Sequence, residues 1–105
     1  MSGTLERIKE LVRAGNVRPS GHARIRFLQR DLQISGIVEG VESAILVEDY
    51  PLDPKGPSAL VLQRYRDGSP VHVVWGILDR MTAVVITAYR PDGELWNGDF
   101  LTRKS

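Results

Sequence analysis

Hydrophobic residues recur at helical spacing through the first part of the chain. Between residues 5 and 12 they stand three and four positions apart, with charged residues between them. This spacing predicts a helix that Thr4 caps and Gly15 ends. Ser20 is a favourable N-cap for a second helix over residues 21–31. Two consecutive helices are therefore expected to open the fold.

A third helix is predicted to follow, with Ser35 as its N-cap. Its apolar positions lie between residues 37 and 45. Gly36 and Gly40 fall inside this segment, and each weakens a helix by roughly 1 kcal/mol relative to alanine. We therefore expect a helix of reduced intrinsic stability here.

After Pro51 the period of the pattern changes from helical to strand-like. Three runs rich in β-branched and aromatic residues predict strands. They span residues 58–66, 71–78 and 83–89. Asp67-Gly68 between the first two runs is a typical hairpin turn. The chain is thus predicted to be an α+β domain, with helices in its first half and an antiparallel sheet in its second.

The C-terminal segment is expected to fold back onto the core. Its apolar residues are paired at 95–96 and at 100–101. Trp75 and Trp96 are interpreted as core residues rather than as platforms for base stacking. The plainer interpretation of residues 103–104 is a frayed basic tail.

The last two strands allow a prediction of register. With a two-residue loop at 80–81, residues whose numbers sum to 161 face each other. His72 then lies opposite Tyr89, and Val74 lies opposite Thr87. Because directly paired residues project from the same face of a sheet, His72, Thr87 and Tyr89 are predicted to form a polar cluster. The other face is predicted to hold Val73, Trp75, Ile77, Val84 and Ile86.

Length and charge refine this picture. The chain has 105 residues, which is the length of one domain, and it has no cysteine. Disulfides, thiolate zinc sites and cysteine nucleophiles are therefore excluded. The net charge is +1, but the charges are unevenly distributed. Residues 1–35 carry seven basic and three acidic residues, and residues 36–60 carry one basic and five acidic residues. Residues 61–105 carry six basic and five acidic residues. A basic lobe of this kind can hold phosphates, and a self-complementary solvated surface is the alternative interpretation.

The sequence contains no sign of export or membrane insertion. Residues 1–7 have no apolar core of a signal peptide. No apolar run approaches the roughly 20 residues that a membrane helix needs. We therefore expect a cytoplasmic protein with no membrane partner.

The two histidines are the candidates for acid–base chemistry. His22 lies on the second predicted helix, where Arg26 and Arg30 follow at four-residue spacing on the same face, and His72 lies in the sheet. Metal-free phosphodiester cleavage needs a base for the ribose 2′-hydroxyl, an acid for the leaving oxygen and a cation for the phosphate. Histidine suits the first two roles and arginine the third. With Tyr89, these residues supply the required set of side chains.

Each candidate also has a plainer interpretation. A histidine in a strand is more often packed or solvent-facing than catalytic, and Arg24, Arg26 and Arg30 can form an ordinary exposed helix face. Tyr89 can be a half-buried sheet residue with a satisfied hydroxyl, and Thr87 a plain strand former. The carboxylates form no ligand pattern with the histidines, so neither a metal nor another cofactor is predicted.

Several stretches in a fixed order resemble a known family. They are SGHARIRFLQR at 20–30, EDYP at 48–51, PSALVL at 57–62, PVHVV at 70–74, VITAYRP at 85–91, Trp96 and DFLTRK at 99–104. Over about residues 18–104 the chain resembles the bacterial family catalogued as domain of unknown function 4258. Where that family usually has glycine and, two residues later, serine, this chain has Asp31 and Gln33.

The family is similar to a branch of the RelE-like, barnase-like toxin ribonucleases. The resemblance implies N-terminal helices packed on one face of a mainly antiparallel sheet of four or more strands. It also implies a small protein antitoxin as partner and RNA, free or on the ribosome, as substrate. The site residues that it implies are His22, Arg26, Arg30, His72, Thr87 and Tyr89.

The resulting hypothesis is an endoribonuclease that leaves a 2′,3′-cyclic phosphate and a 5′-hydroxyl without a metal. His72 would be the general base or acid, Tyr89 would orient or protonate, Arg26 and Arg30 would hold the phosphate, and His22 would assist. One alternative is a non-catalytic domain that binds nucleic acid or protein through the basic helix, including Arg24. A second alternative is an antitoxin-like or immunity protein that docks through the acidic segment 39–53.

Overall fold

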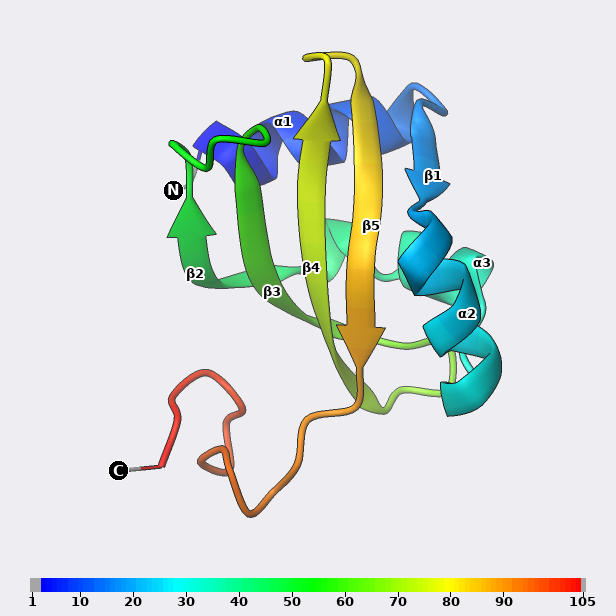
Figure 1. Cartoon of the computed structure of the whole chain (residues 1–105). Coiled ribbons are helices and arrows are strands. Elements are labelled where there is room, and N and C mark those ends of the chain that lie inside the picture. Colours follow the sequence, from blue (N-terminus) through cyan, green and yellow to red (C-terminus); the bar gives the residue numbers. More distant parts are fainter. Residues whose placement is uncertain (1–2, 105) are drawn as a thin grey trace.

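The computed structural model describes residues 3–104, and its helices and strands form an α+β fold (Figure 1). The elements are α1 (Gly3–Arg13), β1 (Val17–Pro19), α2 (Gly21–Arg30), α3 (Ile34–Glu39), the 3₁₀ turn η1 (Val41–Ser43), β2 (Ile45–Tyr50), β3 (Ser58–Arg64), β4 (Pro70–Leu78) and β5 (Thr82–Tyr89). The strands form one five-stranded sheet in the order β1-β5-β4-β3-β2. β1 pairs in parallel with β5, and the other pairings are antiparallel. The predicted fold class, with N-terminal helices and a mainly antiparallel sheet, is confirmed.

One face of the sheet is covered by α1, which crosses behind the strands in Figure 1. The helix buries Leu5, Ile8 and Leu11 against alternate residues of β4 from Val71 to Ile77. Burying a side chain of this size stabilises the fold by about 1.5–3 kcal/mol. We call this side the helical face. The other side, from which the intervening residues of β4 project, is the open face. Within residues 3–104 no helix is long and apolar enough to cross a membrane.

The helical face contains a buried polar link between the sheet and α3. Gln63 is 1% exposed, and its Oε1 accepts a hydrogen bond of 2.7 Å from Nε1 of Trp75. Its Nε2 donates to the carbonyl oxygen of Ile37 at 2.8 Å. Both ends of the buried amide are therefore satisfied, as a buried polar group requires.

The first two helices match their predictions apart from their ends. α1 begins before Thr4, so Thr4 lies inside the helix rather than capping it. Ser20 caps α2 as predicted, and its Oγ accepts a hydrogen bond from the backbone N–H of Ala23. α2 ends at Arg30, and Asp31 follows with a φ of 53°. This left-handed conformation favours glycine, and aspartate is among the few other residues that tolerate it.

The third helix is shorter than predicted. The N-cap of α3 is Gln33, so Ser35 lies within the helix and not at its cap. The helix ends before Gly40, where the backbone passes close to β3. A Cβ at Gly40 would lie 2.2 Å from the carbonyl oxygen of Arg64. Ile45, which was predicted to be helical, instead begins the edge strand β2.

The β4–β5 hairpin has a three-residue loop at 79–81 rather than the predicted two-residue loop. Leu78 pairs with Thr82, so pairs near the loop sum to 160. Further from the loop the predicted register is restored, and His72 does lie opposite Tyr89. The predicted pairing at the polar cluster is therefore confirmed, although the assumed loop length was wrong.

A bulge in β5 accounts for the restored register. Ile86 is the extra residue between the pairs Val74–Thr87 and Trp75–Val85. Because of the longer loop and this bulge, Val84 and Ile86 project from the open face, and their predicted placement on the other face was wrong.

The C-terminal segment folds back near the start of β4, below the sheet in Figure 1. Trp96 is 5% exposed, as predicted, and it forms an antiparallel bridge with Arg103. Leu95 is 63% exposed and does not dock. The segment therefore ends in an ordered bridge, and the interpretation of residues 103–104 as a frayed tail was wrong for Arg103.

Candidate active site on the open face

His72 is fully buried on the open face, beneath the C-terminal segment. It is 0% exposed, and the ring of Trp96 packs edge-on against it at 4.3 Å between centroids. Its Nε2 lies 2.7 Å from the carbonyl oxygen of Phe100, which can only accept a hydrogen bond. In the neutral ring Nε2 therefore carries the proton, and Nδ1 accepts from the hydroxyl of Tyr89 at 3.3 Å. Burial lowers the pKa of His72, which favours this neutral form.

Tyr89 connects the buried histidine with the surface. The side chain is half-buried, and burial raises its pKa. The nearby charges of Arg103 and Arg30 act in the opposite direction and lower that pKa, while Glu48 raises it. The charges of Arg103, Glu48 and Arg30 therefore all act on the Tyr89 hydroxyl, which is hydrogen-bonded to His72.

Arg30 is fixed because α2 replaces β1 along the second half of β5. β1 pairs with only the first half of that strand, which leaves later carbonyl groups of β5 without a strand partner. The Oγ of Ser20 donates to the carbonyl oxygen of Ile86, and Nη1 of Arg30 donates to that of Ala88 at 2.8 Å. The same Nη1 lies 3.4 Å from Oγ1 of Thr87. The structure therefore brings together Arg30 and Thr87, two of the residues that the family resemblance implied.

A second basic group reaches this area from the C-terminal segment. Arg103 pairs with Glu48 of β2 at 3.0 Å, and its guanidinium lies 4.9 Å from the ring centroid of Trp96. The Arg103 hydrogen bond lowers the pKa of Glu48, and the Glu48 hydrogen bond raises the pKa of Tyr50. Arg103, Glu48 and Tyr50 were not predicted as site residues from the sequence. Their only signal was their position inside stretches shared with the family.

The remaining candidates lie along α2. His22 and Arg24 are exposed, and Arg26 is half-buried. Nε of Arg26 donates to Nε2 of His22 at 3.4 Å, and Nη1 donates to the Gln29 side chain at 3.2 Å. The structure thus brings His22 and Arg26 together on the helix, and His72 and Tyr89 together in the sheet, as two separate pairs. Within residues 3–104, no group of three or more histidine, aspartate or glutamate residues is arranged to hold a metal.

The acidic segment between residues 36 and 60 is largely paired within the molecule. Three of its five carboxylates contact arginines. The pairs are Glu42 with Arg13 at 2.6 Å, Glu39 with Arg66 at 3.8 Å, and Glu48 with Arg103 at 3.0 Å. This arrangement fits the self-complementary surface better than an acidic docking face.

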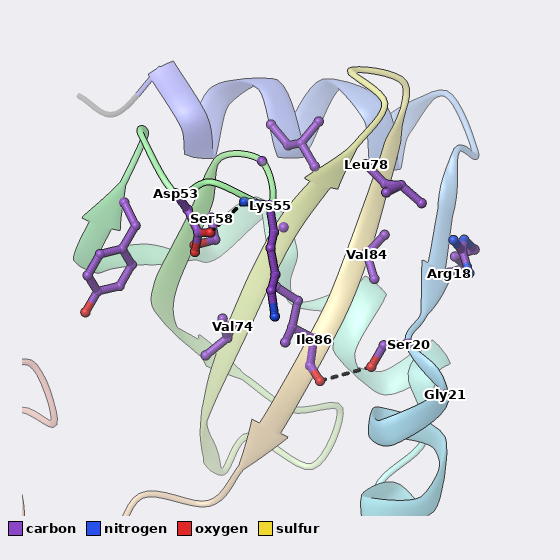
Figure 2. Close-up of a pocket in the computed structure, with 14 residues that line it drawn as sticks. Arg18, Ser20, Gly21, Asp53, Lys55, Ser58, Val74, Leu78, Val84 and Ile86 are labelled. Carbon is purple, nitrogen blue, oxygen red and sulfur yellow. Dashed lines mark hydrogen bonds between the residues drawn. The ribbon is translucent and has the colours of Figure 1, made fainter.

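A cleft of about 660 Å³ lies beside the polar cluster on the open face (Figure 2). Its floor is apolar and consists of Val74, Gly76, Val84 and Ile86. Arg18, Ser20 and Gly21 line one wall, and Asp53 and Lys55 line the opposite one. Val74 belongs to the floor and also pairs with Thr87 of the cluster. The cleft and the cluster are therefore neighbouring parts of one surface.

The fold and this surface define an α+β protein with a sheet that is covered on one side and carries a polar cluster on the other. The chain belongs to the family described as "Domain of unknown function (DUF4258)", which it matches over residues 20–90. The match runs from the N-cap of α2 to just past β5 and is shorter than the span of the sequence resemblance. It includes His72 and Tyr89 but not Arg103. No curated protein and no solved structure matched the chain.

Proposed function

We propose that this protein is a metal-independent endoribonuclease of the toxin type, related to the RelE-like toxins. One observation carries the proposal. The hydroxyl of Tyr89 is hydrogen-bonded to the buried His72, whose other ring nitrogen is fixed by the backbone carbonyl of Phe100, while Arg30 is held on the neighbouring residues of the same strand. A phenol in this setting can take part in proton transfer next to a bound phosphate.

The proposed step is attack by a ribose 2′-oxygen on the neighbouring phosphorus. Tyr89 takes the 2′-hydroxyl proton while its own proton moves to Nδ1 of His72. A P–O2′ bond forms, the P–O5′ bond breaks, and the 5′-oxygen leaves with a proton from water. The products are a 2′,3′-cyclic phosphate and a 5′-hydroxyl. The carbonyl of Phe100 accepts from Nε2–H of His72 and steadies the imidazolium.

The two arginines stabilise the charge that develops on the phosphate. Arg30 is held by its bonds to β5, and Arg103 is oriented by Glu48. Preorganised donors of this kind are often the largest single contribution to such a reaction. His72 is a positioning residue and proton acceptor in this scheme, since it reaches the substrate only through Tyr89. His22 and Arg26 contribute to RNA binding along α2.

A small antitoxin is the expected protein partner. Two large apolar side chains on α2 are exposed, Ile25 at 60% and Leu28 at 88%. Exposed apolar groups next to a charged site are typical of protein interaction surfaces. A partner that covers α2 would block access to Arg26 and Arg30.

The direct test is cleavage of RNA by the purified protein in excess EDTA. We expect the wild type to cleave and to leave cyclic-phosphate ends. His72→Gln should lose at least about 100-fold in rate, because general acid–base catalysis contributes about 10²–10⁴-fold. His22→Gln is the matched control and should lose much less. His72→Ala should also be inactive, and circular dichroism checks that both His72 variants remain folded. Full activity in His72→Gln would contradict the mechanism.

The second candidate is a non-catalytic domain that binds nucleic acid through the basic face of α2. The complete burial of His72 favours this alternative, because a buried and fully hydrogen-bonded histidine is also a plain structural residue. Such a domain should lose affinity in steps as Arg24, Arg26 and Arg30 are replaced, with a clear dependence on salt. It should bind equally well when His72 is replaced by Gln.

A further inference from the structure

We propose that the cleft on the open face binds the nucleotide next to the cleaved phosphate. This inference rests on the proposed ribonuclease function and adds a substrate subsite to it. The cleft lies along the same strands as the polar cluster. Every second residue of β4 projects from the open face, namely His72, Val74, Gly76 and Leu78. His72 of the cluster and Val74 of the cleft floor are therefore two residues apart, which is about 7 Å along the strand.

The floor suits the flat face of a base. Val74, Val84 and Ile86 present aliphatic side chains, and Ile86 is 39% exposed. Gly76 keeps the centre of the floor low, because a Cβ at this position would lie 2.8 Å from Cδ1 of Ile86. An apolar floor with a few polar groups at its rim is typical of ligand sites.

Tyr50 lies between the cleft and the residues next to the polar cluster. It lines the cleft, is 44% exposed, and is hydrogen-bonded to Glu48, the partner of Arg103. An accessible aromatic ring offers a stacking partner for a base that extends out of the active site. A single RNA strand with its phosphate at Arg103 can therefore place its next base beside Tyr50.

The rim of the cleft supplies positive charge for a second phosphate. Lys55 projects over the floor between Val74 and Ile86 in Figure 2, and Arg18 lies on the opposite wall. The positive end of the α2 dipole adds to this charge, since Gly21 begins the helix at the cleft wall. The one carboxylate in the lining, Asp53, accepts bonds from the backbone N–H of Lys55 and from the Ser58 hydroxyl. The charge balance therefore favours an anionic ligand such as RNA.

The test uses the full chain and a short 2′-O-methyl oligoribonucleotide, which has no 2′-hydroxyl to attack. Methyl-detected NMR should show saturable shifts of Val74, Val84 and Ile86 on titration. Tyr50→Ala should weaken binding roughly ten-fold or more, and Tyr50→Phe should leave it within about two-fold. Leu52→Ala is the matched control, because Leu52 lies on the adjoining loop, is 91% exposed and does not line the cleft.

Charge is tested in the same titration. Lys55→Ala should weaken binding and reduce the slope of affinity against salt by about one, whereas Lys9→Ala on α1 should change neither. If the resonances of Tyr89 and His72 shift on titration but the methyl signals of the cleft do not, the subsite is overturned. The ribonuclease proposal is unaffected by that outcome. Unchanged affinity in both Tyr50→Ala and Lys55→Ala would also overturn the subsite. Shifted cleft methyls in a protein that cleaves no natural RNA would instead remove the ribonuclease proposal.

Discussion

The two faces of the sheet surround the buried residues of the same strands in different ways. On the helical face, β4 contributes Val73 and Trp75, which are fully buried, and the polar Gln63 of β3 is satisfied within the core. On the open face, β4 contributes His72, which is equally buried but connected through Tyr89 to charged groups near the surface. Burial alone therefore does not distinguish a core residue from a residue of the proposed site. The difference lies in the hydrogen-bond partners. Those of Gln63 are core groups, whereas His72 is bonded to Tyr89, which is half-buried.

The largest expected effect is on the helical face. Trp75→Ala should cost about 3–5 kcal/mol of stability, since it removes a large side chain that is 0% exposed. Ile86→Ala on the open face should cost about 1 kcal/mol or less, because that side chain already contacts solvent. Urea denaturation of both variants measures the difference. Equal losses would show that the open face is packed like a core.

The buried side-chain amide of Gln63 tests the packing of the helical face in a second way. Gln63→Leu leaves the indole N–H of Trp75 and the carbonyl of Ile37 without their partner. We expect a loss of about 1–3 kcal/mol, the usual cost of an unsatisfied buried polar group. Urea denaturation again provides the measurement. An unchanged midpoint would mean that the link between α3 and the sheet contributes nothing.

The pH dependence of stability tests the environment of His72. Burial lowers its pKa below the ordinary value of 6.5, so at mildly acidic pH the unfolded chain binds a proton that the folded chain does not. Its contribution to stability is therefore largest above pH 6.5 and is lost as the pH falls below that value. The melting temperature should decline between about pH 7.5 and 5.5.

His22 provides the control for this measurement. His72→Gln should remove most of the decline in melting temperature, while His22→Gln should retain it, because His22 is exposed. A decline that survives His72→Gln and disappears in His22→Gln would contradict the described environment of both residues.

The smallest expected effect concerns the salt bridge at the edge of the open face. Arg103→Gln removes the hydrogen bond that lowers the pKa of Glu48, so that pKa should rise towards its ordinary value of 4.5. Global stability should change little, because the side chain of Arg103 is 61% exposed. An NMR titration of the Glu48 carboxylate follows the shift. An unaltered titration would mean that Arg103 does not orient Glu48 in solution.

Much of the fold could be predicted from periodicity, and the errors have physical causes. Ser20 and the apolar spacing were enough to place α2, and β-branched runs were enough to place β4 and β5. β2 was missed because its apolar start at Ile45 continued a helical spacing that Gly40 interrupts. The three-residue loop was missed because Asp79 and Arg80 adopt positive φ without glycine to signal it.

The candidate site was only partly predictable for a different reason. The pairing of His72 with Tyr89 follows from strand register, which is local to one hairpin. The contacts of Glu48 and Arg103 join residues far apart in the sequence and depend on how the C-terminal segment folds back. No periodic pattern encodes that path. The burial of His72 depends on the same segment, through Phe100 and Trp96, and could not be anticipated from the strand alone.

The most direct test of the account is the rate of RNA cleavage by Tyr89→Phe beside the wild type, in excess EDTA and with end-group analysis of the products. This variant keeps the ring and removes only the hydroxyl that links His72 with the surface. We predict cyclic-phosphate products from the wild type and a rate at least about 100-fold lower for Tyr89→Phe. Cleavage by Tyr89→Phe at the wild-type rate, or no cleavage by either protein, would contradict a ribonuclease site on the open face.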